Sequence, residues 1–398
     1  MQPRATATAA KTTRGCAERI IGLSCTTGPR KPGASLVERC RPTSFGLAHG
    51  SRARARAEVR AFTALHEKGH ETQEHEAVER ANETEQPELP SRTGFGVVIT
   101  GSTKGVGLAL AKEFLRMGDR VVVCSRRQSS VDETVQVLAE RYGKDRVFGV
   151  SCDVSDAADV KVLGEFASSR LGLVDIWINN AGTNAYQFKS LIETSSTDLR
   201  EIVETNTLGL MLCMKEAINL MKSQEDASDP AKEYVGHIFN MDGAGTSGSA
   251  TPRFAAYGAT KRAITQLNKS VQAELGMLKI GNVKLHMLSP GMVTTDLLMA
   301  GGDTKIAKYM INALAEEPKD VATFLVPRVR QVVTDPRAGG PEAGQDEGLE
   351  EMSALDSVMA AINGGSTYIK YLTLPKAFSQ ILTKAVFGTR KNRFIQEE

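Results

Sequence analysis

The 398-residue sequence has no run of 18 or more apolar residues, so no segment has the length and apolar character of a membrane-spanning helix. It also has little net charge, only +2, and the first 57 residues carry eleven Lys or Arg against two acids. The remainder is therefore net acidic, which gives no basis for a nucleic-acid surface. Apolar residues make up 41% of the chain, enough for a sizeable core.

Paired cysteines and metal-ligand spacings are scarce as well. None of the six cysteines forms a Cys-x-x-Cys motif, and Cys124, Cys152 and Cys213 lie in apolar stretches, where buried, reduced thiols are expected. The segment His66-Glu-Lys-Gly-His70 matches the H-E-x-x-H pattern of zinc proteases. Its internal glycine weakens a helix and its flanks are charged, so we expect no metal site there.

The composition divides the chain into segments. Residues 1–55 are rich in Ala, Arg, Thr and Ser and poor in acids, which predicts an organelle transit peptide or else a disordered basic tail. A charged linker is expected over 56–93, a main domain over 94–334 and a flexible Pro-, Gly- and acid-rich insertion over 335–350. Residues 351–398 are expected to complete the domain with a strand and a basic amphipathic helix, 374–393.

From residue 96 onward, short apolar segments alternate with helical patterns. Such alternation predicts right-handed βαβ crossovers and a parallel sheet covered on both faces. We therefore predict an α/β fold: a single Rossmann-like domain with a doubly wound, mostly parallel sheet. The expected strands are 96–100, 120–124, 146–150, 174–178, 235–239, 283–288 and 367–372, and the expected helices include 106–117, 156–170, a long pair over 197–223, and 254–277.

A glycine-rich turn joins the first predicted strand to its helix. It has the sequence Thr100-Gly-Ser-Thr-Lys-Gly-Val-Gly107. Glycines allow a tight turn and a close approach of the backbone, and the helix N-terminus that follows favours a pyrophosphate. The sequence thus predicts a dinucleotide site formed by Gly101, Ser102, Thr103, Lys104, Gly105, Val106 and Gly107.

The end of the second strand bears on the choice of cofactor. Where an NAD enzyme commonly has an acid for the ribose 2′-hydroxyl, this chain has Ser125-Arg126-Arg127, with Lys104 in the glycine turn. Cations without a carboxylate favour a 2′-phosphate and hence NADPH. The alternative is that these are two ordinary surface arginines.

Tyr257 and Lys261 are the candidate catalytic pair. They lie four residues apart in a helical pattern, and therefore on one face. An ammonium beside a phenol favours the phenolate, so we expect Lys261 to lower the pKa of Tyr257 and make it a usable general acid. Without further context such a pair is more often an ordinary surface pair.

These motifs together resemble the short-chain dehydrogenase/reductase family. The glycine spacing, Asp153-Val154, Asn179-Asn-Ala-Gly182, Asn206, Tyr257-x-x-x-Lys261 and Pro290-Gly-Met-Val-Thr-Thr295 all carry the resemblance, over about residues 94–300. It implies that Tyr257 is the general acid, that Lys261 binds the nicotinamide ribose, and that Asn206 holds a water of the proton relay. It further implies cofactor contacts from Asp153, Val154, Asn180, Ala181, Gly182, Pro290, Gly291, Val293 and Thr295.

One family residue is missing. The Ser that usually lies thirteen residues before the Tyr is replaced by Ala244, in a loop about two residues longer than usual, where Asp242 and Gly243 take the places after the strand. Removing one oxyanion donor typically costs about 2.7–4 kcal/mol of transition-state stabilisation, so a substitute is expected. The candidates are Thr246, Ser247, Ser249, Asp242 and a backbone amide.

The unusual loop that contains Ala244 narrows the resemblance to one group of enzymes within the family. The segments His237–Gly245, Thr251–Arg262, Ser289–Leu298 and Phe387–Phe394 are similar to those of plant and algal chlorophyll(ide) b reductases, in particular the shorter form without transmembrane spans. This resemblance implies NADPH-dependent reduction of the 7-formyl group of chlorophyll(ide) b to a hydroxymethyl group. It also implies a chloroplast location on the stromal side, peripheral to the thylakoid membrane, with the longer membrane-bound reductase as a partner and a homo- or hetero-oligomeric state.

Two other functions remain open from the sequence. One is a soluble carbonyl reductase for another apolar ketone or an acyl-carrier-bound substrate, and the other is a non-catalytic NADP(H)-binding subunit. The C-terminal amphipathic helix is expected to pack on protein, or else on a membrane surface or a partner.

Overall fold

The computed structural model describes residues 94–224, 234–334 and 366–397, all within one compact unit. The predictions for 1–55, 56–93 and 335–350, the His66–His70 segment and the part of the last segment over 351–365 lie outside the described residues. Within the described ranges, no helix is long and apolar enough to cross a membrane.

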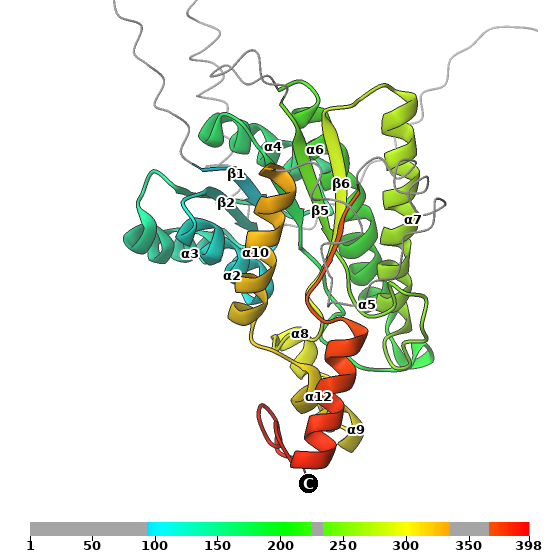
Figure 1. Cartoon of the computed structure of the whole chain (residues 1–398). Coiled ribbons are helices and arrows are strands. Elements are labelled where there is room, and N and C mark those ends of the chain that lie inside the picture. The colour runs from blue at the N-terminus through cyan, green and yellow to red at the C-terminus, as the bar shows by residue number, and fades with distance from the viewer. Residues whose placement is uncertain (1–93, 225–233, 335–365, 398) are drawn as a thin grey trace, which may run out of the picture. The chain divides into compact units, whose positions relative to one another are not determined.

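Seven parallel strands form one sheet at the centre of this unit (Figure 1). Its strand order is β3-β2-β1-β4-β5-β6-β7, so the chain builds outward in one direction from β1, then crosses over to β4 and continues in the other. The predicted doubly wound parallel sheet is confirmed. The strands are β1 (Gly96–Ile99), β2 (Arg120–Ser125), β3 (Val147–Ser151), β4 (Ile176–Asn179), β5 (Gly236–Met241), β6 (Val283–Ser289) and β7 (Tyr368–Lys370).

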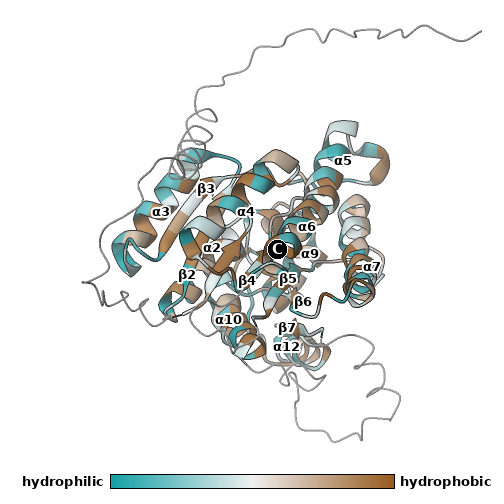
Figure 2. Cartoon of the chain, turned by 90° about the horizontal axis from the view of Figure 1, so that it is seen from above, coloured by the Kyte–Doolittle hydropathy of each residue, from teal (hydrophilic) through white to brown (hydrophobic). Residues whose placement is uncertain are grey.

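Helices cover both faces of the sheet because the strand residues alternate between two apolar clusters. In β1, Val97 and Ile99 face the cluster that contains α2 and α10, whereas Val98 faces the cluster of α4 and α6. Figure 2 shows hydrophilic and hydrophobic residues along the same helices around the sheet. This is expected of helices that pack one face on a sheet and expose the other. The helices are α2 (Gly105–Arg116), α3 (Gln128–Tyr142), α4 (Ala157–Leu171), α5 (Ser196–Val203), α6 (Leu210–Met221), α7 (Ala255–Met277), α8 (Asp296–Met299), α9 (Lys305–Leu314), α10 (Pro318–Thr334) and α12 (Leu374–Phe387).

The predicted buried cysteines and the predicted helix pair can both be checked. Cys124, Cys152 and Cys213 are buried free thiols, as expected. Residues 197–223 are not two separate helices: α5 continues through a π-helical segment, Glu204–Gly209, directly into α6. The wider turn matters because π-helical segments frequently occur at functional sites.

The C-terminal segment extends beyond the sheet and packs beside α9 at one end of the molecule (Figure 1). The helix α12 ends at Phe387, earlier than the predicted 393, where Gly388 adopts a left-handed conformation. The residues after it are held by ion pairs from Arg390 and Arg393 to the buried Glu316, each at 2.8 Å. The side chain of Asn312 binds the backbone of Phe394 and Ile395 at 2.6–3.1 Å.

Candidate active site

A groove of about 710 Å³ lies over the carboxyl ends of the strands, within the usual size range of small-molecule sites. It spans the position between β1 and β4 where the strand order reverses, which is where ligands bind in open α/β sheets. The groove brings together most of the predicted residues. These are Gly101, Thr103, Lys104, Gly105, Val106, Ser125, Arg126, Asp153, Val154, Asn180, Ala181, Gly182, Tyr257, Lys261, Pro290, Gly291, Val293 and Thr295.

Four predicted residues do not line the groove. Ser102 is fully buried and its hydroxyl donates to the Ile99 carbonyl at 2.6 Å, so it connects the glycine turn to the end of β1. Gly107 packs inside the turn, Arg127 is the residue before α3, and Asn206 lies buried behind the catalytic pair. Ser102, Gly107 and Asn206 therefore shape the site without facing the cavity, whereas Arg127 is exposed.

The glycine turn has the geometry that a pyrophosphate requires. Gly101 and Gly105 have φ angles of +64° and +57°, a region that disfavours other residues. A Cβ at Gly107 would lie 2.5 Å from both the Gly101 carbonyl and the Asn180 amide, so no side chain fits. The turn leads into α2, whose first turn carries no acid, and the cradle therefore fits a dinucleotide.

Two of the three cations predicted for a 2′-phosphate, Lys104 and Arg126, each have an acidic neighbour. Lys104 pairs with Asp296 at 3.0 Å and lies over the Tyr186 ring, 4.8 Å from its centroid. Arg126 is 3.7 Å from Glu201. All of these side chains are substantially exposed, so the pairs are weak and can exchange for a phosphate.

Tyr257 and Lys261 come from the first two turns of α7, and both are buried. The Lys261 ammonium donates to the Met241 carbonyl at 3.0 Å and lies 5.7 Å from the centre of the Tyr257 ring. Burial lowers the pKa of Lys261 to about 8 and raises the pKa of Tyr257 above its ordinary value. The expected lowering of the Tyr257 pKa is therefore wrong for this structure, because loss of hydration on burial, together with the charge of Asp242, raises it.

Asn206 projects from the π-helical segment toward the backbone beneath the groove. Its side-chain oxygen accepts from the Thr183 amide at 2.8 Å, and its nitrogen donates to the Thr183 carbonyl at 2.8 Å and the Thr260 hydroxyl at 3.1 Å. A Cβ on Gly182 would lie 3.4 Å from the Asn206 oxygen and 3.7 Å from the Lys261 ammonium. Asn206 thus ties α7 to the strand-four loop next to Lys261.

The position next to the Tyr257 hydroxyl belongs to Gly243, which corrects the assignment of Ala244 as the missing family Ser. A Cβ on Gly243 would lie 2.4 Å from the Tyr257 hydroxyl, so a side chain here would displace the phenol. Ala244 is exposed beside it. The longer loop explains the difference, because counting back from Tyr257 passes over its extra residues.

The proposed substitutes for that Ser are mostly directed elsewhere. The Thr246 hydroxyl donates to the Gly243 carbonyl at 2.7 Å, and the hydroxyls of Ser247 and Ser249 are exposed and lie 2.9 Å apart. Asp242 is buried, lines the groove and accepts a hydrogen bond from the Tyr368 hydroxyl of β7. Asp242 is therefore the polar side chain of this loop that faces the cavity.

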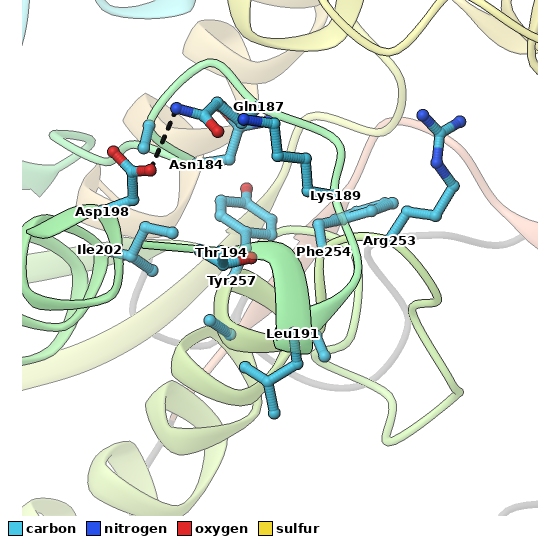
Figure 3. A pocket seen from close by; sticks show the side chains of 13 residues that line it. Asn184, Gln187, Lys189, Leu191, Thr194, Asp198, Ile202, Arg253, Phe254 and Tyr257 are labelled. Atoms are coloured by element: carbon cyan, nitrogen blue, oxygen red, sulfur yellow. Dashed lines mark hydrogen bonds between the residues drawn. The ribbon is translucent and has the colours of Figure 1, made fainter. Parts of the chain in front are cut away.

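A second, small pocket lies beside the Tyr257 ring (Figure 3). Gln187 donates to Asp198 at 3.1 Å on one side of it, and Phe254 packs on the other. Arg253 fixes this region by bonding Asp303 at 2.8 Å and the Phe188 carbonyl at 2.9 Å. No local pattern in the sequence indicates these contacts, because Arg253, Phe188 and Asp303 come from three separate loops.

Comparison with known proteins agrees with this geometry. Residues 96–306 match the short chain dehydrogenase family. The chain is 48% identical over 304 residues to chlorophyll(ide) b reductase NOL, chloroplastic, of Oryza sativa subsp. japonica, covering 76% of this chain and 79% of that protein. It is also 48% identical over 309 residues to the protein of the same name from Arabidopsis thaliana, covering 78% and 79%. A solved 3-ketoacyl-(acyl-carrier-protein) reductase from Brucella melitensis complexed with NADH is 25% identical, covers 61% of this chain and 91% of its own, and has a TM-score of 0.49.

Proposed function

Since this chain belongs to the short-chain dehydrogenase/reductase family, we propose that it is a chlorophyll(ide) b reductase, which converts the 7-formyl group to a hydroxymethyl group in the breakdown of chlorophyll b. The observation that carries the proposal is the 48% identity over most of both chains to two chloroplast enzymes of that name. The geometry supports it, because Tyr257 and Lys261 line the same groove as the glycine turn that is proposed to hold the cofactor.

The cofactor of this family is a pyridine nucleotide, which supplies a hydride to the carbonyl carbon when it is bound. The reduction is balanced by one proton, which Tyr257 donates to the carbonyl oxygen as the alcohol forms. Lys261, buried beside the phenol ring, stabilises the phenolate that remains. Asn206 holds the loop at Gly182 in place through the bonds of its amide group to Thr183.

NADPH is the form of the cofactor that we propose. Ser125 and Arg126 line the groove at the end of β2, the position at which an NAD enzyme commonly carries an acid. Lys104, in the glycine turn, also lines the groove. A phosphate there would gain charge-assisted hydrogen bonds from these side chains, which NADH lacks the group to accept.

Purified protein without residues 1–55 is expected to convert chlorophyll b or chlorophyllide b to its 7-hydroxymethyl product with NADPH, and much more slowly with NADH. The absorption spectrum of the pigment reports the conversion, because the formyl group is conjugated with the ring. Reduction of an acyl-carrier-bound or other apolar ketone, with no turnover of either pigment, would contradict the proposal. So would cofactor binding with no reduction of any carbonyl.

The proposed location is the stromal side of the chloroplast, peripheral to the thylakoid, alongside the longer membrane-bound reductase. An exposed apolar stripe on α12 supports a membrane contact. It consists of side chains spaced at about one helical turn: Leu374, Phe378, Leu382, Val386 and, next to it, Phe387.

Replacing both Phe378 and Leu382 by Asp is expected to weaken binding to phosphatidylcholine vesicles that contain phosphatidylglycerol by more than about tenfold. Each of these side chains gains about 1.5–3 kcal/mol when it leaves water, and a charge reverses that gain. Vesicle co-sedimentation measures the change. Val137→Asp is the matched control, since Val137 is an exposed apolar residue on α3. Equal binding by the double variant and the control would contradict the membrane contact.

A further inference from the structure

Asp242 is a buried carboxyl group that the chemistry above leaves without a role. It directly follows β5, is 7% exposed, and lines the groove. Its two sequence neighbours both touch the catalytic pair: the Met241 carbonyl accepts from the Lys261 ammonium at 3.0 Å, and Gly243 lies against the Tyr257 hydroxyl. The backbone thus holds this carboxyl next to both members of the catalytic pair.

Groups from three elements face the carboxyl. The Tyr368 hydroxyl donates to it from β7, and the Ser289 hydroxyl bonds it from the end of β6. Lys370 of β7 and Lys261 of α7 are the cations close enough to act on it. Burial raises the pKa of Asp242 above its ordinary value, and the two hydroxyl donors and two cations oppose that rise by favouring the ionised form.

An ionised Asp242 cannot replace the missing Ser, because a carboxylate accepts hydrogen bonds and does not donate them. Its charge acts on the neighbouring groups instead. A negative charge opposes the loss of a proton from a nearby phenol and from a nearby ammonium. Both effects favour the protonated forms of Tyr257 and Lys261. Carbonyl reduction needs the proton of Tyr257.

We propose that Asp242 is a positioning residue that keeps Tyr257 and Lys261 protonated and so extends carbonyl reduction to higher pH. The inference deepens the proposed function and rests on it. The electrostatics of the site agree in direction: Asp242 raises the pKa of Tyr257, in addition to burial, and raises that of Lys261 against the larger effect of burial. Tyr368 holds the carboxyl in place, so β7 contributes to the site from the edge of the sheet.

Asp242→Asn is the direct test, because Asn has the same shape and can still accept from Tyr368. Without the charge, the pKa of Tyr257 falls, and the alkaline limb of kcat for reduction moves to lower pH by about one pH unit or more. The rate of the reverse reaction, oxidation of the alcohol, rises with pH, and in Asp242→Asn this rise is also expected to move to lower pH. Asp242→Glu keeps the charge and is expected to retain most of the wild-type profile.

A second readout does not depend on turnover. The absorbance of phenolate, taken as the difference between each protein and its Tyr257→Phe counterpart, titrates Tyr257 directly. The midpoint is expected to fall in Asp242→Asn, and also in Asp242→Ser, which serves if the Asn variant does not fold. Glu216→Gln, which removes a partly buried carboxyl on α6 away from the groove, is the charge control and should leave the midpoint unchanged.

The outcomes separate the two proposals. A profile and a midpoint that stay in place or move to higher pH overturn the role of Asp242. A uniform fall in kcat at every pH, with no shift of the limb, also overturns it and indicates a purely structural part. If the wild-type protein reduces no pigment, the proposed function fails, while the phenolate titration still decides the inference.

Discussion

Replacing Tyr257 by Phe is expected to lower kcat for carbonyl reduction by about two to four orders of magnitude, the usual contribution of a positioned general acid. The Phe ring fills the same buried space beneath the groove, so the packing of Phe254 and Lys261 around it is retained. The lost hydroxyl is the group beside Gly243 from which the oxygen of the substrate would receive its proton. Steady-state kinetics with pigment and NADPH measures the loss.

Cofactor binding separates this loss from misfolding. Tyr257→Phe should bind NADPH with close to wild-type affinity, because the glycine turn and Lys261 are unchanged. Tyr371→Phe is the matched control: Tyr371 is buried beside β7 but does not line the groove, so its loss should leave kcat within a small factor. A Tyr257→Phe enzyme with more than about a tenth of the wild-type kcat would contradict the acid role.

Glu316→Ala is expected to destabilise the protein by about 3 kcal/mol, at the lower end of the cost of breaking a buried ion pair. Glu316 is buried and holds both Arg390 and Arg393 at 2.8 Å, and these two arginines can reach water once it is lost. Chemical denaturation measures the free energy of unfolding. The exposed neighbour Glu317→Ala is the control and should change that free energy by less than about 0.5 kcal/mol.

The same variant should also weaken cofactor binding. The backbone of Glu316 pairs with the loop after β6, through the Thr294 amide at 2.9 Å and the Met292 carbonyl at 3.0 Å. That loop lines the groove with Val293 and Thr295, so release of the C-terminal tail is transmitted to residues that are expected to contact the cofactor. Unchanged stability and unchanged NADPH affinity in Glu316→Ala would show that the tail does not support the site.

Much of the fold was accessible from local patterns. The alternation of short apolar segments with helical ones predicted all seven strands, because a parallel sheet buried on both faces requires it. Helical spacing placed Tyr257 and Lys261 on one face of α7. The glycine turn was recognised because Gly101 and Gly105 need positive φ angles that only a few residues adopt.

The errors have physical causes of two kinds. Counting back from Tyr257 to find the family Ser gave Ala244 because the loop after β5 is longer than usual. Within this loop Gly245, at φ +101°, packs its backbone against Gly258. The pKa of Tyr257 was mispredicted because burial is a property of the whole domain. A neighbouring Lys261 can be read from the sequence, but the water that both groups lose cannot.

The roles of Tyr368 and Glu316 had no local signature. Tyr368 reaches Asp242 across 126 positions of sequence, and the residues between them follow no motif. Glu316 follows α9 like any exposed acid until the C-terminal tail covers it. Such contacts are fixed by the packing of distant elements, which composition and spacing do not report.

The edge strand β7 has a consequence for biosynthesis. During translation the ribosome releases β1 to β6 well before residues 368–370, and the last turn of the tail follows later still. The carboxyl of Asp242 therefore meets its tyrosine only after residue 368 has been synthesised, and Glu316 meets its arginines only after residue 393. A nascent chain can form most of the sheet before these contacts exist, since pairings between residues distant in sequence form slowly.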